Sequence, residues 1–237
     1  MEFLSDIELY ICSNFSEEEK ILEINEDEFH HSVKVMRNKT GDKIFATNGK
    51  GKIFEGIITE IGKENLTAKI VQSFEFENEL ENFTICIPNL KNPERFKFAL
   101  EKSIELGFTN FIIFTSERTI SKNINLKRIE KISLAAMKQS LHSYFPKINL
   151  AKAVSELANP NHNIVLFDQS STLVLSDYKF NKGSKYFLIF GPEGSFSESE
   201  IKILKPNLSF NLGNYRLRTE TAIVKCASII SAVIKND

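Results

Sequence analysis

The sequence has no long apolar run, no basic segment near its start and no cluster of cysteine with histidine. No window approaches eighteen uncharged apolar residues, which excludes a membrane-spanning helix. The first fifteen residues are acidic, so no secretory signal peptide is predicted. The three cysteines are dispersed in apolar stretches, and the four histidines form no metal-binding pattern. We therefore expect no disulfide framework, no structural metal and a reducing, cytoplasmic location.

Several catalytic motifs are also missing. The chain contains no Gly-x-Gly-x-x-Gly or Walker pattern, which disfavours dinucleotide and P-loop nucleotide binding, and no Gly-x-Ser-x-Gly nucleophile elbow. What remains is ordinary globular composition, with 42% hydrophobic and 26% charged residues. A chain of 237 residues is long enough for one large domain or two small ones.

Charge is distributed unevenly along the chain. Residues 1–79 hold 9 Lys and Arg against 17 Asp and Glu, whereas residues 80–237 hold 21 against 14. This asymmetry favours two modules, with an anionic partner for the second. Within the acidic first module, residues 29–53 form a local basic segment with six Lys and Arg and the single acid Asp42. That segment is either an ordinary solvated face or a contact for an anion.

The first module, residues 1–74, has the pattern of a small β domain. Residues 20–24 predict a strand and residues 26–36 a short helix, and three more strand-like runs follow from residue 41. Asn48-Gly49-Lys50-Gly51 is typical of a tight hairpin turn. A meander of this size favours closure into a small barrel. The polar, acidic residues 75–82 predict a linker.

The second module, residues 83–237, alternates between strands and helices. Short apolar runs typical of buried parallel strands are FTICIPNL, FIIFTS, NIVLFD, KYFLIFG and LSFNLG. Helices are predicted from Pro93, with Asn92 as N-cap and Gly107 just past the end, over residues 125–143, and from about Glu220. The last helix is apolar nearly all round and must be buried on most sides. The fold class is therefore α/β with a parallel sheet.

The most informative run is FGPEGSFSESE, residues 190–200. A buried strand ends at Gly191–Gly194 and a helix begins at once, with Ser197 and Glu200 spaced as a capping box. Open α/β sheets bind ligands at the carboxyl ends of their strands, and glycine lets a ligand approach the backbone closely. The pattern predicts a ligand loop, with an ordinary tight strand-to-helix turn as the alternative.

A second run, LGNYRLRTETA at residues 212–222, repeats this arrangement. A buried strand ends near Gly213, Arg216 and Arg218 follow, and Thr219 or Thr221 is placed to cap the last helix. The two loops predict two walls of one pocket. The alternative for the arginines is a pair of solvated surface charges.

Together, these two runs resemble the signatures of the 16S rRNA uridine-N3 methyltransferase family, one of the knotted SPOUT methyltransferases. The resemblance covers nearly the whole chain. Further matching segments are HHSVKVMRNKTGDKI (30–44), EKSIELG (101–107), SERT (116–119) and AMKQS (136–140). The chain departs from the family at Tyr215, where many members carry an arginine that here is Arg216, and at His142 and Tyr144, where arginines are common. These departures concern RNA contacts and leave the cofactor loops intact.

The resemblance implies an N-terminal PUA-like barrel and a C-terminal domain whose last part threads a deep trefoil knot. It also implies a homodimer, with the apolar last helix in the interface, and S-adenosylmethionine (AdoMet) bound in the knot. By position, the cofactor-binding residues are Gly191, Pro192, Glu193, Gly194, Leu212, Gly213, Asn214, Leu217, Arg218 and Thr219.

The implied reaction is methyl transfer from AdoMet to N3 of a uridine in small-subunit ribosomal RNA. Loss of the N3 proton leaves negative charge on O2 and O4, which a nearby cation stabilises. Arg218 is the first candidate for that cation, and Arg37 is expected to orient the base. Glu220 is either the proton acceptor or a negative charge that favours the helix N-terminus. Because N3 lies on the Watson–Crick edge, the target must be unpaired when it reacts.

The RNA-contacting surface is expected to combine side chains of both modules. Its predicted members are His31, Lys34, Arg37, Lys91, Arg95, Lys102 and Arg118, with ordinary surface charges as the alternative for the stripe at Lys91, Arg95 and Lys102. Two other functions remain open: a non-catalytic RNA-binding or ribosome-assembly factor that kept the fold, and a related knotted methyltransferase that acts on tRNA.

Overall fold

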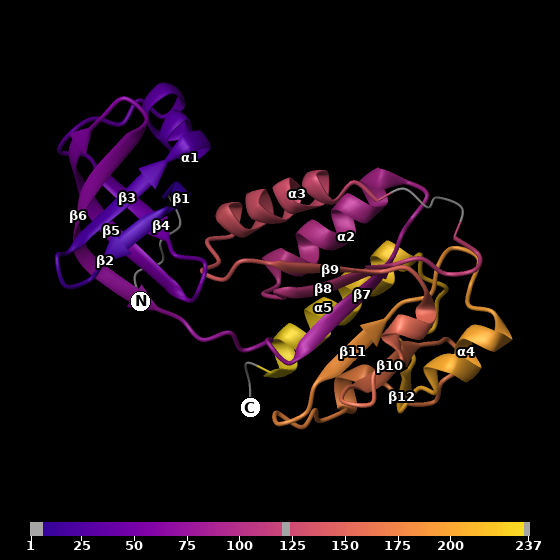
Figure 1. The fold of residues 1–237 in the computed structure, drawn as a ribbon. Helices are drawn as coiled ribbons and strands as arrows, with labels where there is room; N and C mark the ends of the chain where they lie inside the picture. Colours follow the sequence, from indigo (N-terminus) through magenta and orange to yellow (C-terminus); the bar gives the residue numbers. More distant parts are fainter. Residues whose placement is uncertain (1–6, 120–123, 235–237) are drawn as a thin grey trace. The chain divides into compact units, whose positions relative to one another are not determined.

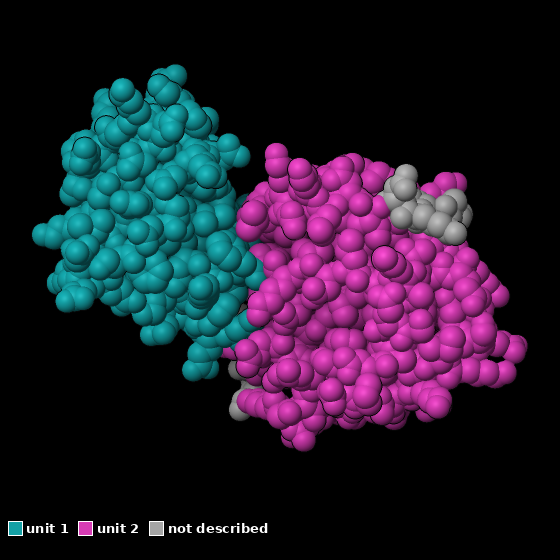
Figure 2. Space-filling model, viewed as in Figure 1, with its two compact units in different colours: residues 1–78, 137–145 teal, residues 79–136, 146–237 magenta. Residues whose placement is uncertain are grey.

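The structure, a computed structural model, describes residues 7–119 and 124–234. It divides into two compact units, coloured separately in Figure 2. Unit 1 comprises residues 1–78 and 137–145, and unit 2 comprises residues 79–136 and 146–237. Both chain ends and residues 120–123, which the predicted modules include, lie outside the described residues.

Unit 1 is built on one six-stranded sheet in the order β1-β4-β5-β6-β3-β2 (Figure 1). Its neighbouring strands are antiparallel except for β1 and β4, which are parallel. The strands are β1 (Leu9–Ile11), β2 (Asn14–Ser16), β3 (Ile21–Asn25), β4 (Lys43–Thr47), β5 (Lys52–Ile61) and β6 (Asn65–Glu75). The four strands predicted from residue 20 onward are confirmed. The two three-residue strands β1 and β2 were not predicted, since they are too short to show an alternating pattern.

Alternation along the strands of unit 1 supplies its core. Leu22 and Ile24 of β3 and Leu66 and Ala68 of β6 are completely buried in one cluster, with Phe54 of β5 packed among them. Successive side chains of a strand point to opposite faces, so β3 and the first half of β6 bury every second residue. The predicted helix is α1 (Glu26–His30), which continues into a π-helical turn, η1 (His31–Val35).

Residues 137–145 join unit 1 through backbone and ring contacts that sequence reasoning did not anticipate. Ser143 offers its carbonyl to the Gly51 N–H at 3.0 Å and to the Thr47 hydroxyl at 3.2 Å. The Tyr144 hydroxyl donates to the Phe76 carbonyl at 2.9 Å. Gly49 has a φ of +66°, and a Cβ there would collide with the Phe145 ring. The hairpin turn predicted at this position is therefore also a packing site.

Unit 2 has a six-stranded, fully parallel sheet in the order β12-β10-β11-β7-β8-β9. Its strands are β7 (Phe83–Pro88), β8 (Asn110–Phe114), β9 (Lys147–Ala151), β10 (Asn163–Phe167), β11 (Tyr186–Ile189) and β12 (Leu208–Phe210). Its helices are α2 (Pro93–Glu105), α3 (Leu126–Gln139), η2 (Val154–Leu157), η3 (Leu175–Asp177), α4 (Glu198–Leu204) and α5 (Thr219–Ile234). The predicted α/β class with a parallel sheet is confirmed.

The five predicted strands of unit 2 are present, and a sixth, β9, was missed. Strands buried on both faces read as continuous apolar runs, as Ile85, Cys86 and Ile87 of β7 do. By contrast, β9 lies at the edge of the sheet and leaves most of its KINLA residues exposed or half-buried. Its sequence therefore lacked the signal that revealed the others.

Helices cover both faces of this sheet. Phe187, Ile189 and Ile164 pack on one face with Leu204 of α4 and Leu157 of η2. Helices α2 and α5 pack against each other, and Figure 1 shows α2 and α3 running beside β8 and β9. The structure thus places the carboxyl ends of all strands at one edge, where loops of different origin meet.

The predicted helix boundaries are accurate at α2 and too long at α3. The Asn92 side chain accepts the Glu94 N–H at 2.9 Å, Pro93 opens α2, and Gly107 follows it with a φ of +99°. Helix α3 ends at Gln139, four residues before its predicted end, and Leu141 has a φ of +58°. The chain leaves the helix there because residues 137–145 pack into unit 1.

Candidate functional site

Three loops of unit 2 meet at the carboxyl ends of neighbouring strands. They follow β10, β11 and β12, and together they line an open cleft of about 760 Å³. A smaller cavity of about 90 Å³ continues from it and shares Phe167, Asp168 and Gln169 as lining residues. Clefts of this size and position are typical of small-ligand sites in α/β domains.

The loop after β11, residues 190–197, is held in place from three other parts of the chain. The Thr219 hydroxyl at the start of α5 donates to the Gly191 carbonyl at 2.9 Å. Arg118 donates from Nη1 to the Gly194 carbonyl at 2.9 Å. Arg95 of α2 lies 3.2 Å from the Glu193 carboxylate. These contacts fix the loop backbone, so its remaining polar groups present a preorganised surface to the cleft.

A capping box fixes the far end of the same loop. The Glu200 N–H donates to the Ser197 hydroxyl at 3.2 Å, and the Ser197 N–H donates to the Glu200 carboxylate at 2.9 Å. The second oxygen of Glu200 accepts the Glu117 N–H at 2.9 Å. This capping box confirms the local prediction from the sequence, and its buried carboxylate also ties the 116–119 segment to α4.

The loop after β12 is organised by Asn211, which sequence reasoning missed. Its side chain accepts the Gly213 N–H at 2.7 Å and donates to the Gln169 carbonyl at 3.0 Å. Gly213 has a φ of +139°, and a Cβ there would lie 2.9 Å from the Lys225 amine. A side chain at this position is strained whatever the space around it. An Asn directly after a short strand was the available signal, because Asn side chains close local turns.

Charged groups in the cleft separate into paired and unpaired sets. The Nε atom of Arg95 lies 3.5 Å from Glu220, whose residue is only 9% exposed, and its Nη1 reaches Glu193. Arg216 and Arg218 also line the cleft, and neither forms an ion pair among the described residues. The two arginines after β12 are therefore the cations available to a ligand, whereas Arg95 is occupied by the protein's own carboxylates.

The cleft brings together most of the predicted cofactor residues. Six line it directly: Gly191, Pro192, Glu193, Leu217, Arg218 and Thr219. Leu212 and Gly213 line the smaller cavity, whereas Gly194 and Asn214 flank the loops without lining either cavity. The segment Phe167–Gln169 lines both cavities and was not among the predicted site residues. Phe167 is the last residue of β10, and Asp168 and Gln169 follow it, so polar residues at the end of a buried strand were the signal.

The predicted RNA-contacting residues lie in different surroundings. In unit 1, Lys34 and Arg37 are exposed, and His31 lies 3.0 Å from the Glu8 carboxylate. In unit 2, Lys91 is exposed and Lys102 pairs with Glu105 at 2.7 Å. The stripe expected along α2 is thus interrupted by ion pairs at two of its three positions, Arg95 and Lys102.

The basic segment 29–53 is also partly neutralised in the fold. Lys43 pairs with Glu55 at 2.7 Å and Lys52 pairs with Glu17 at 2.6 Å. Within the described residues, no ion pair is formed by Lys34, Arg37, Lys39 or Lys50. Because Glu55 and Glu17 pair with Lys43 and Lys52, only the other cations of residues 29–53 are free to bind an anion.

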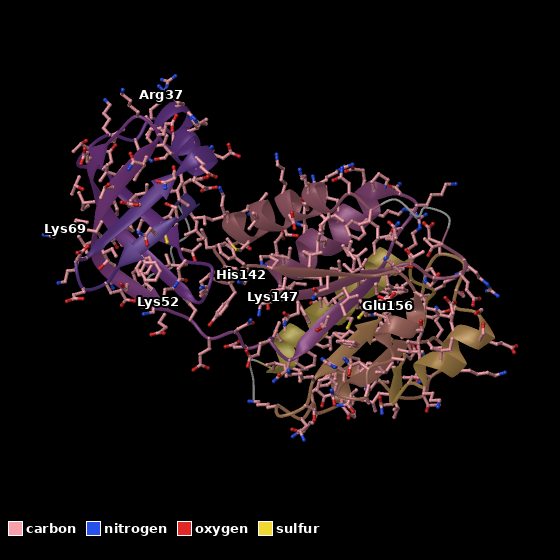
Figure 3. All side chains as sticks on the ribbon, viewed as in Figure 1. Arg37, Lys52, Lys69, His142, Lys147 and Glu156 are labelled. Atoms are coloured by element: carbon pink, nitrogen blue, oxygen red, sulfur yellow. The ribbon has the colours of Figure 1, made fainter. Side chains whose placement is uncertain are left out.

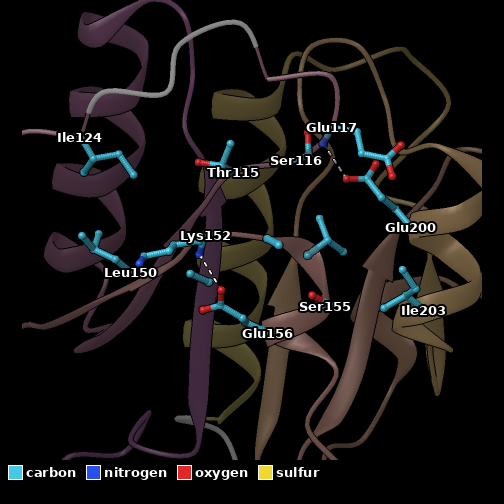
Figure 4. Close-up of a pocket in the computed structure, with 13 residues that line it drawn as sticks. Thr115, Ser116, Glu117, Ile124, Leu150, Lys152, Ser155, Glu156, Glu200 and Ile203 are labelled. Atoms are coloured by element: carbon cyan, nitrogen blue, oxygen red, sulfur yellow. Dashed lines mark hydrogen bonds between the residues drawn. The ribbon is translucent and has the colours of Figure 1, made fainter.

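A second cavity, of about 950 Å³, lies at the ends of β8 and β9 (Figure 4). Two of its carboxylates are engaged by the protein's own backbone: Glu200 accepts the Glu117 N–H at 2.9 Å, and Glu156 accepts the Lys152 N–H at 3.1 Å. The cavity contains none of the predicted cofactor residues. We therefore place the candidate site in the cleft of about 760 Å³ at the ends of β10, β11 and β12, where the unpaired Arg216 and Arg218 lie.

Metal and thiol chemistry find no support in the part of the chain that the structure describes. No group of three or more His, Cys, Asp or Glu side chains is arranged for a metal ion there. All three cysteines are buried and free, and burial raises the pKa of the Cys12 thiol to about 11 and the pKa of Cys86 and Cys226 well above the usual range. Among residues 7–119 and 124–234, no helix has the length and apolar character that crossing a membrane requires.

Comparison with known families decides what this arrangement is. Residues 77–231 match the model of an RNA methyltransferase domain, and residues 24–71 match that of an RNA methyltransferase PUA domain. The chain belongs to the RNA methyltransferase family. The cleft at the ends of β10, β11 and β12 lies inside the matched methyltransferase domain, and the matched PUA segment lies inside unit 1.

Individual relatives align with most of this methyltransferase. The Ribosomal RNA small subunit methyltransferase E of Rickettsia conorii is 27% identical over 225 residues, covering 91% of each chain. The protein of the same name from Bacillus subtilis is 26% identical over 235 residues, again covering 91% of each chain. The chain thus aligns with these relatives across both units.

Solved structures show the same fold. A probable rRNA-methyltransferase from Porphyromonas gingivalis superposes with a TM-score of 0.82 at 27% identity, covering 97% of this chain and 99% of that one. The Ribosomal RNA small subunit methyltransferase E from Neisseria gonorrhoeae, solved with S-adenosyl methionine bound, has a TM-score of 0.84 at 23% identity and covers 96% and 98%. At that identity, the second likeness concerns the fold alone.

Proposed function

We propose that this RNA methyltransferase transfers a methyl group from AdoMet to N3 of a uridine in 16S ribosomal RNA. The observation that carries the proposal is the cleft itself: Gly191 of the loop after β11 and Arg218 of the loop after β12 meet around one cleft, and Gly213 lines the small cavity that adjoins it. The names of the full-length relatives support small-subunit ribosomal RNA as the substrate. The unpaired arginines favour catalysis over the alternative of a non-catalytic assembly factor.

The residues present suit AdoMet as the cofactor. The cleft is lined by Phe167, Pro192 and Leu217 together with Gly191, and Gly213 lines the smaller cavity beside it. Flat apolar surfaces suit an adenine ring, and free backbone polar groups suit its edge and the ribose hydroxyls. Glu193 and Glu220 add negative charge on the side of the cleft where Arg95 holds them. A cationic sulfonium centre and an amino-acid group fit such a mixed lining.

Bound AdoMet supplies an electrophilic methyl group, and the protein's own residues prepare the base that accepts it. Arg218 lines the cleft without an ion pair, so its guanidinium is free to stabilise the negative charge that develops on the uracil oxygens. Arg216 is the neighbouring cation and the second candidate. The carboxylate of Glu220 lies 3.5 Å from Nε of Arg95, and the residue is only 9% exposed. We therefore assign Glu220 to positioning Arg95 and leave the proton acceptor open.

Further properties complete the proposal. The hydrogen bond from Thr219 to Gly191 ties the start of α5 to the loop after β11, which supports a knotted passage of the last segment. Helix α5 buries Ile223, Cys226, Ala227 and Ile230 within unit 2, and leaves Ile229 and Val233, four positions apart on one face, partly exposed. That second apolar stripe supports a homodimer.

We also propose that unit 1 closes as a PUA-like barrel and that the enzyme acts in the cytoplasm, where its RNA substrate would be found.

One experiment tests the modification and the RNA together. Ribosomal RNA from a strain that lacks this gene is digested to nucleosides and analysed by mass spectrometry. We expect loss of N3-methyluridine from small-subunit RNA, restored by the wild-type gene and not by an Arg218→Ala copy. Loss of a methylated nucleoside from tRNA instead would favour the related tRNA enzyme, and an unchanged nucleoside profile would favour the non-catalytic alternative.

A further inference from the structure

The end of the η1 turn in unit 1 presents two apolar side chains to solvent in a group of cations. Val35 is 63% exposed and Met36 is 47% exposed. Lys34, Arg37 and Lys39 surround them in the sequence, all three are exposed, and none forms an ion pair among the described residues. Arg37 lies at the outer end of the α1–η1 segment in Figure 3. We call these five residues the η1 tip.

The η1 tip is held rigidly, which a merely solvated loop does not require. The Met36 N–H donates to the His31 carbonyl at 3.0 Å, and the Asn38 N–H donates to the Ser32 carbonyl at 3.1 Å. The Asn38 side chain also donates to the Ser32 hydroxyl at 2.9 Å and to the Tyr10 hydroxyl at 3.2 Å. Ser32 and Tyr10 are buried in unit 1. The tip is thus fixed on the core of the unit.

Backbone strain marks the same place. Arg37 has a φ of +60°, a conformation that a residue with a long side chain adopts at a cost of about 1 kcal/mol or more. The π-helical turn directly before it is a rare geometry found mostly at functional sites. Together they turn the chain so that Val35 and Met36 point outward instead of joining the core, where neighbouring Phe29 and Val33 pack.

We propose that the η1 tip is a surface for unpaired RNA bases, in which Val35 and Met36 contact base faces while the cations hold phosphates. Charge complementarity selects this occupant: residues 31–41 contain cations and no Asp or Glu. Apolar side chains, methionine among them, insert between bases in other nucleic-acid complexes, and unpaired RNA exposes its base faces. The inference rests on the proposed function, which requires an unpaired target.

The salt dependence of RNA affinity distinguishes phosphate contacts from base contacts in a binding experiment. Each phosphate contact contributes about 0.7 to the slope of log affinity against log salt for a single strand, whereas apolar contacts contribute nothing to it. The test uses the full chain and fluorescence anisotropy with a twelve-nucleotide oligouridylate and a hairpin RNA of equal charge, over a series of salt concentrations.

The double variant Val35→Ser/Met36→Ser is expected to bind the oligouridylate about tenfold more weakly, from the loss of buried apolar area, with its salt slope unchanged. Hairpin binding should change little. Lys34→Ala/Lys39→Ala should instead flatten the slope for both RNAs. Val71→Ser removes a 54% exposed valine of β6 and is the matched control, expected to bind like the wild type.

Two results would overturn the proposal. Wild-type affinity of Val35→Ser/Met36→Ser for the oligouridylate would remove the base contact, and a change in molar mass of that variant by light scattering would make the tip a protein interface. The single variants Val35→Ser and Met36→Ser, with circular dichroism, guard against misfolding. Methyl transfer to ribosomal RNA by the wild type is measured in parallel. If the wild type methylates this RNA and the tip variants still bind RNA like the wild type, the inference about the η1 tip is wrong while the proposed function stands.

Discussion

The hydroxyl of Thr219, the first residue of the last helix, donates a hydrogen bond of 2.9 Å to the carbonyl of Gly191, which lies 28 positions earlier in the sequence. This bond joins the two loops that the sequence identified separately. It also means that Thr219 does not act as the helix cap that its position suggested. Its side chain instead supports the backbone of the loop that we propose binds AdoMet.

Replacing Thr219 by valine should weaken AdoMet binding without unfolding the protein. Valine has nearly the same shape but cannot donate, so the part-buried Gly191 carbonyl loses a partner at a cost of about 1 kcal/mol, or roughly fivefold in affinity. Isothermal titration calorimetry measures this directly. Thr219→Ser keeps the donor and serves as the control; equal weakening by both variants would show that the methyl group, not the hydrogen bond, matters.

A side chain at Gly213 should abolish cofactor binding while the fold persists. Gly213 has a φ of +139°, and a Cβ there lies 2.9 Å from the Lys225 amine, so Gly213→Val must distort the loop after β12. At Gly194 a Cβ would lie 3.2 Å from the Cβ of Arg118, so Gly194→Val should displace that arginine as well. Calorimetry with AdoMet and far-ultraviolet circular dichroism give the two readouts. Gly183→Ala, outside the cleft, is expected to bind normally; wild-type affinity of both loop variants would refute the assignment of the cleft.

Arg218→Ala should slow methyl transfer far more than it weakens RNA binding. By analogy with removal of one oxyanion donor, we expect a loss of about two to three orders of magnitude in rate. The salt dependence of RNA affinity should stay unchanged, whereas Lys91→Ala should flatten its slope by about 0.7 to 0.9. Single-turnover methylation of small-subunit particles and salt-titrated binding are measured for each variant. If Arg218→Ala lost binding and rate equally, the catalytic cation would have to be Arg216 or Arg37.

Two neighbouring isoleucines of α5 should respond differently to a charge. Ile230 is fully buried inside unit 2, so Ile230→Asp leaves an unpaired charge in the core and should unfold the chain. Ile229 lies on the partly exposed stripe, so Ile229→Asp should yield folded monomers from the proposed dimer. Light scattering and thermal melting distinguish the two outcomes. A folded dimer of Ile229→Asp would place the interface elsewhere.

The buried thiols should make the folded state sensitive to high pH. Burial raises the pKa of Cys12 to about 11 and raises the pKa of Cys86 and Cys226 as well. In the unfolded chain a thiol ionises near pH 8.5, so the stability from the protonated, buried form is complete below that pH. It declines as pH rises from about 8.5 towards 11. Denaturant melts across this range measure the effect, and Cys12→Ala should reduce it; a pH-independent midpoint would contradict the assignment.

Local sequence patterns were enough to predict the elements whose residues also suit their surroundings in the fold. Continuous apolar runs revealed five of the buried parallel strands, Asn92, Pro93 and Gly107 bounded α2, and Ser197 with Glu200 formed the expected capping box. Each of these depends on residues a few positions apart, whose spacing is visible in the sequence. The resemblance to a methyltransferase family likewise rested on contiguous segments, and the family comparison confirmed it.

The tertiary structure alone decided which distant residues meet. Arg95 looked like a phosphate contact on a helix face, yet the packing of α2 against α5 brings it to Glu220, and the loop after β11 brings Glu193 to it. Strand β9 lies at the edge of the sheet, where most of its residues are exposed or half-buried, and its sequence therefore contains no apolar run. Residues 137–145 were predicted as the end of a helix, yet they belong to unit 1. Such pairings depend on chain topology rather than on local spacing. A sequence records which side chains are present, but their partners follow from how the strands and helices pack.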